Sequence, residues 1–110
     1  FLNVRMLITG ANGLLGSTLF EYIGKQGAIV EKFNRQKFSW HDHNLNIKSL
    51  VDFDCIIHAA ANTNVEACEL DPISCYKDNT LFTERLAYAA SQASCKFIFR
   101  WARAYFLQIY

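Results

Sequence analysis

The sequence contains no run of apolar residues long enough to cross a bilayer, and its beginning lacks the charged head, apolar middle and small-residue cleavage site of a signal peptide. It also lacks internal repeats and low-complexity segments. Its net charge is only +1, which gives no electrostatic preference for nucleic acid or for a membrane surface. These absences predict a globular cytoplasmic protein that binds neither nucleic acid nor membrane.

The spacing of the cysteine and histidine residues indicates neither a disulfide framework nor a metal site. The four cysteines form no CxxC pair, and two of them lie inside apolar periodic segments, so we expect reduced thiols that act as small core side chains. The one cluster with metal-ligand chemistry is His41, Asp42 and His43. No second cluster follows it at a suitable spacing, which favours a solvated loop over a metal site.

The apolar content of the chain is that of one domain. It holds 110 residues, of which 52% are hydrophobic, enough to bury a single core but few for a two-domain enzyme. It begins at Phe1 rather than at methionine, and we expect it to be a fragment or a processed product.

The stretch most informative about function is Thr9 to Gly16, which reads T-G-A-N-G-L-L-G and follows the apolar run Val4 to Ile8. A strand that stops at a glycine, turns within three residues and restarts as an apolar helix is typical of a phosphate-binding turn. Gly10 permits the tight turn, Gly13 lets the backbone approach a diphosphate, and Gly16 lets the helix pack on the strand. The spacing is GxxGxxG rather than the commoner GxGxxG, so an ordinary strand, turn and helix remains an alternative.

The periodicity of the apolar residues predicts alternating strands and helices. In chain order we expect a strand at Val4–Thr9, a helix from Leu14 closed by Gly27, a strand at Ala28–Phe33, a polar loop at Lys37–Asn46, a short helical crossover near Ile47, Leu50 and Val51, a strand at Asp54–Ala59, a long helix from Pro72 to about Gln92, and a strand at Lys96–Phe99. The predicted fold class is α/β, a Rossmann-type doubly wound parallel sheet, truncated to four or five strands.

Beyond Phe99 the pattern fails, because residues 100–110 show neither clear alternation nor turn chemistry. We therefore expect an incomplete nucleotide-binding domain over residues 1–99 and an atypical tail over residues 100–110, with no substrate domain. The last parallel strand would then leave an open sheet edge and exposed apolar surface, which favours self-association into a homo-oligomer.

Polar or small residues after the expected strands indicate how a ligand is selected. Asn34 and Arg35 follow the second strand, where a carboxylate would accept from a ribose 2′-hydroxyl and repel a 2′-phosphate. A guanidinium in place of an acid favours NADP(H) over NAD(H), although the pair also fits a simple polar turn. Ala59, Ala60 and Ala61 leave room for a ligand at the end of the third strand, or allow a helix to pack closely there.

A polar residue, Asn79, lies in the apolar stripe of the long helix. A buried amide must be hydrogen-bonded, so it either pins a loop or faces a ligand. Three parts of the sequence, namely Leu7–Gly16, Asp54–Pro72 and Asn79, together give the chain its resemblance to a known family. The chain resembles the extended short-chain dehydrogenase/reductases, and within them the dTDP-4-dehydrorhamnose reductase group of sugar-nucleotide reductases. The segment Ala59–Glu69, A-A-A-x-T-x-V-x-x-x-E, is more specific than the glycine turn because it fixes many positions. The match covers most of Val4–Phe99.

The resemblance implies an NAD(P)-binding Rossmann domain and a set of cofactor contacts. It places Gly10, Asn12, Gly13, Leu14, Leu15 and Gly16 at the diphosphate turn, Asn34 and Arg35 by the adenosine ribose, Asn46 and Ile47 at the adenine, and Ala59, Ala60, Ala61 and Thr63 along the path to the nicotinamide ribose, with Asn79 supporting the loop beneath it. Glu69 falls in a region that the family associates with sugar-nucleotide sites and subunit contacts.

The departures from the family concern catalysis. The position of the Ser/Thr that polarises the substrate carbonyl is taken by Trp101 or Ala102. Tyr105 is followed four places on by Ile109 rather than by the lysine of the family's Tyr–Lys pair. No catalytic residue is therefore expected on this chain. We interpret the tail as foreign to the family, the result of a shifted reading frame or a truncated gene.

Three functions remain open on these observations. The leading one is the cofactor-binding portion of a sugar-nucleotide reductase, whose parent activity is hydride transfer from NADPH to a 4-keto sugar nucleotide. The second is a noncatalytic nucleotide-binding module, of the kind that the regulatory subunit of methionine adenosyltransferase represents within the same broad group. The third is a nonfunctional truncated remnant, which the expected open sheet edge would favour.

Overall fold

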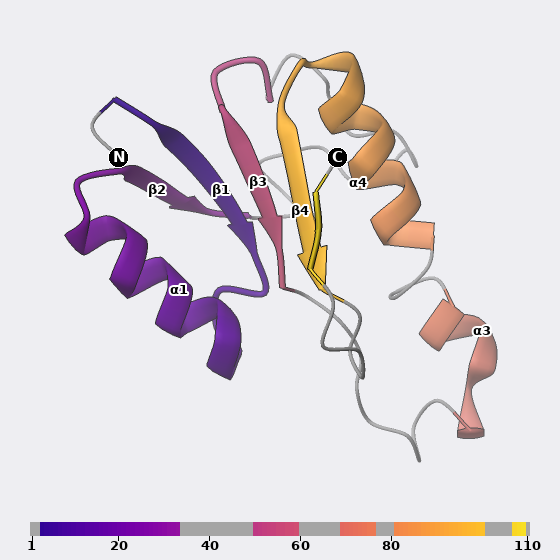
Figure 1. Cartoon of the computed structure of the whole chain (residues 1–110). Coiled ribbons are helices and arrows are strands. Elements are labelled where there is room, and N and C mark those ends of the chain that lie inside the picture. The colour runs from indigo at the N-terminus through magenta and orange to yellow at the C-terminus, as the bar shows by residue number, and fades with distance from the viewer. Residues whose placement is uncertain (1–2, 34–49, 60–68, 77–80, 101–106, 110) are drawn as a thin grey trace.

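The computed structural model describes residues 3–33, 50–59, 69–76, 81–100 and 107–109. Within those ranges, five strands form one sheet in the order β2-β1-β3-β4-β5, and helices lie beside it (Figure 1). The strands are β1 (Arg5–Thr9), β2 (Ile29–Lys32), β3 (Cys55–His58), β4 (Lys96–Arg100) and β5 (Leu107–Ile109). The helices are α1 (Leu14–Lys25), α3 (Pro72–Tyr76) and α4 (Phe82–Gln92).

Strand β1 is an interior strand at which the order of the strands reverses, since β2 is added on one side of it and β3 on the other. β2 pairs in parallel with one side of β1, β3 pairs in parallel with the other side, and β4 continues in parallel beyond β3. Open α/β sheets bind ligands in the crevice outside the carboxyl ends of the strands at such a reversal, here the ends of β1 and β3. The predicted Rossmann-type arrangement of these strands is confirmed.

Alternate side chains of the strands enter two separate cores, one on each face of the sheet. Leu7, Ile56 and Phe97 are register partners across β1, β3 and β4, and they pack in the core that contains the buried side of α4. Ile8 and Ile57 lie one position further along and pack in the core that contains α1. α1 and α4 therefore cover opposite faces (Figure 1), so the sheet is doubly wound, as predicted.

The first helix ends as predicted but packs over only part of its length. Gly27 follows its cap residue in the left-handed conformation, with φ 93°, and is the expected glycine at the helix end. Ile23 is buried in the core with Ile8. Leu14 and Tyr22 recur with Ile23 at the spacing of an apolar helical stripe in the sequence, and yet they are 89% and 58% exposed. The first turn extends beyond the carboxyl end of β1 (Figure 1), which explains the exposure of Leu14.

Three other predicted elements differ in the structure. β2 is not buried on both faces, and Ile29 is 55% exposed, because β1 is the one strand that pairs with β2 among the described residues. The segment predicted as one helix over residues 72–92 contains α3 and α4, and residues 77–80 between them lie outside the described residues. Leu50 and Val51, from the predicted helical crossover, form part of a turn, with Leu50 buried and Val51 exposed.

The tail contributes a strand that the sequence did not predict. β5 pairs antiparallel with β4, with Ile109 opposite Ile98 and Leu107 opposite Arg100. Three residues are too few to show a periodicity, so the pattern could not reveal this strand. The expectation of an open sheet edge at β4 is therefore wrong, because β5 covers that edge.

Candidate functional site

The glycine turn joins β1 to α1 at the carboxyl end of the parallel strands. Gly10 follows Thr9, the last residue of β1, and its φ of 67° lies in the left-handed region that glycine favours. The carbonyl oxygen of Gly10 accepts a hydrogen bond from the N–H of Gly13 at 3.0 Å, which closes the turn. α1 begins at the next residue, Leu14. The predicted order of strand, turn and helix is confirmed.

Gly13 and Gly16 are explained by different features of this turn. A Cβ on Gly16 would overlap the carbonyl group of Gly10, so the absence of a side chain lets α1 pack against the turn. A Cβ on Gly13 would lie 3.4 Å from the Gly10 oxygen, which is ordinary contact, and the backbone of Gly13 is extended with φ −78°. The fold alone thus does not require glycine at position 13. Close approach by a ligand gives a reason for the bare backbone there.

The first turn of α1 has the electrostatic character of an anion site. Its cap residue, Gly13, makes no side-chain cap, and the turn contains no acidic residue. Two nearby hydroxyl groups bond away from the amides, since Ser17 Oγ and Thr18 Oγ1 donate to the carbonyl oxygen of Leu14 at 3.1 and 2.8 Å. The leading N–H groups of a helix have no partner within it and carry the positive end of its dipole. They can therefore bind an anion without competition from a cap or a carboxylate in that turn.

Exposed side chains and one small residue border the N–H groups at the start of α1. Leu14 is almost fully exposed, Leu15 is 39% exposed, and Asn12 is exposed within the turn. Directly after β3, the N–H of half-buried Ala59 donates to the carbonyl oxygen of Thr9 at 3.2 Å, which brings Ala59 beside the start of the turn. The structure thus brings together the predicted site residues that it describes, namely Gly10, Asn12, Gly13, Leu14, Leu15, Gly16 and Ala59.

The remaining predicted site residues lie outside the described residues, namely Asn34, Arg35, Asn46, Ile47, Ala60, Ala61, Thr63 and Asn79. The same holds for His41, Asp42 and His43. The N–H of Phe33 donates to the carbonyl oxygen of Ile8 at 2.8 Å, so the pairing of the second strand with β1 reaches the residue before Asn34. Glu69 is described and is exposed.

One residue at this end of the sheet was missed by the sequence-based predictions. His58, the last residue of β3, is only 4% exposed. Its Nδ1 lies 2.6 Å from Thr9 Oγ1, and its Nε2 lies 2.8 Å from Thr83 Oγ1 on α4. Burial lowers the pKa of His58 to about 4, so the imidazole is neutral at pH 7. The signal in the sequence was a titratable residue inside an apolar strand, directly before the three alanines.

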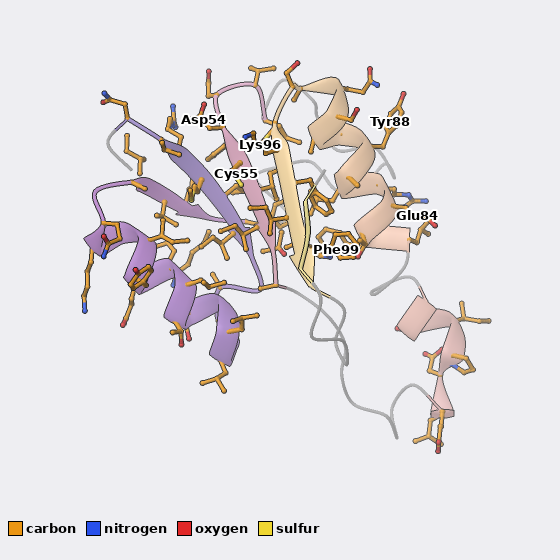
Figure 2. The ribbon with its side chains drawn as sticks, in the orientation of Figure 1. Asp54, Cys55, Glu84, Tyr88, Lys96 and Phe99 are labelled. Atoms are coloured by element: carbon orange, nitrogen blue, oxygen red, sulfur yellow. The ribbon has the colours of Figure 1, made fainter. Side chains whose placement is uncertain are left out.

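Charged residues at the opposite, amino-terminal end of the sheet make structural contacts. The carboxylate of Asp54 accepts a hydrogen bond from the backbone N–H of Arg5 at 2.8 Å, and the Arg5 guanidinium lies 5.4 Å from the centroid of the Phe53 ring. Figure 2 shows Asp54 and Lys96 together at this end, away from the glycine turn. These contacts hold the strands in register and lie away from the crevice.

Two cysteines, Cys55 and Cys95, are core residues. Cys55 and Cys95 are buried and free. Burial raises the pKa of both thiols, that of Cys95 to about 12, so both are protonated at neutral pH. Within the described ranges, no group of three or more histidine, cysteine or acidic residues is placed to hold a metal ion. In the same ranges, no helix combines the length and the apolar character needed to span a membrane.

The sequence matches known reductases. The family described as the RmlD substrate binding domain matches residues 4–102. A dTDP-4-dehydrorhamnose reductase of Aggregatibacter actinomycetemcomitans is 34% identical over 89 residues, which cover 78% of this chain and 30% of that protein. A probable low-salt glycan biosynthesis reductase of Haloferax volcanii is 34% identical over 77 residues, which cover 59% of this chain and 26% of that protein.

The structure matches the same class of protein. A dTDP-4-dehydrorhamnose reductase from Clostridium acetobutylicum superposes with a TM-score of 0.73 and 28% identity, covering 86% of this chain and 34% of that chain. One from Bacillus anthracis, solved in complex with NADP, superposes with a TM-score of 0.69 and 27% identity, covering 88% of this chain and 35% of that chain. The chain therefore spans about a third of the length of these relatives.

Proposed function

We propose, on the premise that the chain belongs to the RmlD substrate binding domain family, that it forms the dinucleotide-binding part of a sugar-nucleotide reductase. The observation that carries this proposal is Gly13. It is a glycine that neither sterics nor dihedral angles require, at the uncapped start of a helix, beside the strand reversal where such sheets bind ligands. A diphosphate seated on these amides accounts for all three features.

Each residue of the turn has a role in this proposal. The N–H groups at the start of α1 hold the diphosphate, and the left-handed Gly10 together with Gly16 fixes their direction. The exposed side chains of Leu14 and Leu15 cover the bound cofactor and exclude water from it. Ala59 leaves the crevice open toward the nicotinamide side. The nicotinamide, when bound, supplies the hydride.

The preferred cofactor in this proposal is NADP(H). Asn34 and Arg35 directly follow Phe33, whose N–H donates to the carbonyl oxygen of Ile8 in β1. The end of this strand is the place of the adenosine ribose in this fold. A guanidinium there favours a 2′-phosphate, and no acid stands beside it in the sequence to repel one. The Bacillus anthracis relative was solved with NADP, which agrees with this preference.

Reduction of a 4-keto sugar nucleotide is the activity that we propose for the longer protein of which this chain is the cofactor domain. The relatives named as dTDP-4-dehydrorhamnose reductases are about three times as long as the matched region. In this chain, residues 100–110 carry neither the Ser/Thr nor the Tyr–Lys pair of the resembled family. We therefore place the cofactor domain at residues 1–99 and assign no catalytic residue.

A second candidate, a noncatalytic nucleotide-binding module, is favoured by β5. This strand from the tail runs antiparallel along β4 and so covers the edge at which the parallel strands would otherwise stop. Because a strand of the tail, rather than a further parallel strand, covers this edge, the arrangement suits a self-contained binding module. Both candidates require the same dinucleotide site.

Calorimetric titration of the chain with NADPH and with NADH tests the proposal. We expect NADPH to bind about tenfold more tightly, because the 2′-phosphate gains a charge-assisted contact. Arg35→Gln should remove this difference and leave NADH binding unchanged. Equal affinities in the unaltered chain would refute the interpretation of Asn34 and Arg35, and failure of both cofactors to bind would refute the proposed function. Turnover of a dTDP-4-keto sugar would show that the chain does carry catalytic groups.

A further inference from the structure

A chain of side-chain hydrogen bonds lies directly behind the glycine turn. Thr9 Oγ1 is 2.6 Å from His58 Nδ1, and His58 Nε2 is 2.8 Å from Thr83 Oγ1. Thr9 ends β1, His58 ends β3, and Thr83 lies in the first turn of α4. One imidazole ring therefore connects the two strand ends that border the crevice to the helix that covers one face of the sheet.

The ring of His58 is held in a single orientation. It lies between the rings of Phe82 and Phe97, with centroid distances of 5.2 and 5.8 Å. Both of its nitrogens face hydroxyl groups, so rotation of the ring would lose both bonds. A neutral imidazole has one donor and one acceptor, and a hydroxyl group can complement either. Burial keeps the imidazole neutral, which is the state that this arrangement requires.

The position of Thr9 is transmitted to the proposed diphosphate site within a few bonds. Gly10 follows Thr9 directly, and the Gly10 carbonyl oxygen accepts the hydrogen bond from Gly13 that closes the turn. The same carbonyl group lies so close to Gly16 that a Cβ there would overlap it. A displacement of Thr9 would therefore displace the start of α1, because backbone contacts leave no slack between them.

We infer that His58 is a positioning residue for the dinucleotide, which fixes the glycine turn through Thr9 and ties it to α4 through Thr83. The inference rests on the proposed function, which supplies the ligand of the turn. His58 does not touch the ligand in this scheme. It acts through Thr9, and loss of its hydrogen bonds weakens cofactor binding because the amides of α1 are no longer held in one direction.

The test compares variants of the whole chain for NADP⁺ affinity, measured by calorimetry, and for melting temperature, measured by circular dichroism. His58→Phe keeps a ring between the two phenylalanines and removes both hydrogen bonds. Thr83→Val removes the hydrogen bond to His58 Nε2 and keeps a β-branched side chain of similar size, and Thr83→Ser retains the hydroxyl. Ala89→Gly, on the buried side of α4 and six residues after Thr83, destabilises the same helix and leaves the hydrogen bonds of His58 intact.

We expect Thr83→Val to weaken NADP⁺ binding by about fivefold and His58→Phe by about tenfold or more, with Thr83→Ser close to the unaltered chain. Ala89→Gly should lower the melting temperature and leave the affinity unchanged. If His58→Phe does not fold, the Thr83 pair decides. Unchanged affinity in Thr83→Val, or an equal loss in Ala89→Gly, would overturn the inference and leave the proposed function intact. Failure of the unaltered chain to bind NADP⁺ would instead overturn the proposed function, and the inference with it.

Discussion

Replacing Gly13 and Gly16 separately by alanine distinguishes a ligand-binding turn from a merely structural one. Both residues lie at the start of α1, and the substitution adds the same single methyl group at each. At Gly16 the added Cβ would overlap the backbone carbonyl of Gly10, whereas at Gly13 it would make an ordinary 3.4 Å contact with the Gly10 oxygen. We therefore expect Gly13→Ala to weaken ligand binding with little effect on stability, and Gly16→Ala to lower stability.

The expected magnitudes follow from these contacts. Gly16→Ala forces backbone to move in a packed turn, which costs about 3 kcal/mol and lowers the melting temperature by about 15 °C. Gly13→Ala loses part of the preference for glycine at a helix cap and gains from the reduced entropy of the unfolded chain, so its net effect on the free energy of unfolding stays within about 1 kcal/mol. Its Cβ, however, stands where the diphosphate would approach, and we expect about a 30-fold loss of NADPH affinity, which corresponds to about 2 kcal/mol.

Thermal unfolding followed by circular dichroism and titration with NADPH measure the two effects on each variant. The reasoning holds if Gly13→Ala melts near the unaltered chain and binds poorly, and if Gly16→Ala melts well below it. It is refuted if Gly13→Ala loses stability and affinity in proportion, since the glycine would then serve only the turn. It is also refuted if Gly13→Ala binds NADPH normally.

Acidification and a second glycine of α1 give two further predictions. Because burial lowers the pKa of His58 from its usual 6.5 to about 4, the unfolded chain binds more protons between these values, so the free energy of unfolding falls as the pH drops from 6.5 towards 4. The free energy of unfolding falls by about 3 kcal/mol in all, because the two pKa values differ by about 2.5 and each pKa unit corresponds to about 1.36 kcal/mol. Urea unfolding at several pH values should show this dependence in the unaltered chain and not in His58→Phe. Equal pH dependence in both chains would assign the acid sensitivity to other groups. Gly24 lies inside α1, and a Cβ added there would meet no atom within 4 Å, so Gly24→Ala should raise the free energy of unfolding by about 0.5–1 kcal/mol, and a lower melting temperature would contradict this.

The parts of the fold that local rules decide could be predicted from the sequence. The apolar runs of β1, β3 and β4 are short and bounded by turn residues, so their positions agree with the structure to within one or two residues. Gly27 marks the end of α1 because a left-handed residue there favours glycine. Gly10 and Gly16 likewise follow from backbone geometry, which a sequence expresses directly.

The parts that tertiary contacts decide could not be predicted. β5 forms because β4 offers an unpaired edge to three residues of the tail, and no local pattern in those residues reveals it. Leu14 continues an apolar stripe and is nevertheless exposed, because burial depends on where the sheet ends. The role of His58 could not be predicted for the same reason, since its hydrogen-bond partners, Thr9 and Thr83, are 49 and 25 residues away in the chain.

The uncapped start of α1 shows how stability and binding are linked in this fold. A serine or aspartate at position 13 would cap the helix with its side chain and stabilise it by about 0.3 kcal/mol relative to glycine, yet the chain has glycine there and no acidic residue in the first turn. A bound diphosphate would occupy the same amides and so take the part of the missing cap. A ligand that binds only the folded state stabilises it, by about 2.7 kcal/mol at a concentration 100 times its dissociation constant. A bound dinucleotide would therefore stabilise the chain by more than a side-chain cap at position 13 would. The N–H groups at the start of α1 thus explain two features: the helix has no side-chain cap, and it offers hydrogen-bond donors to an anion.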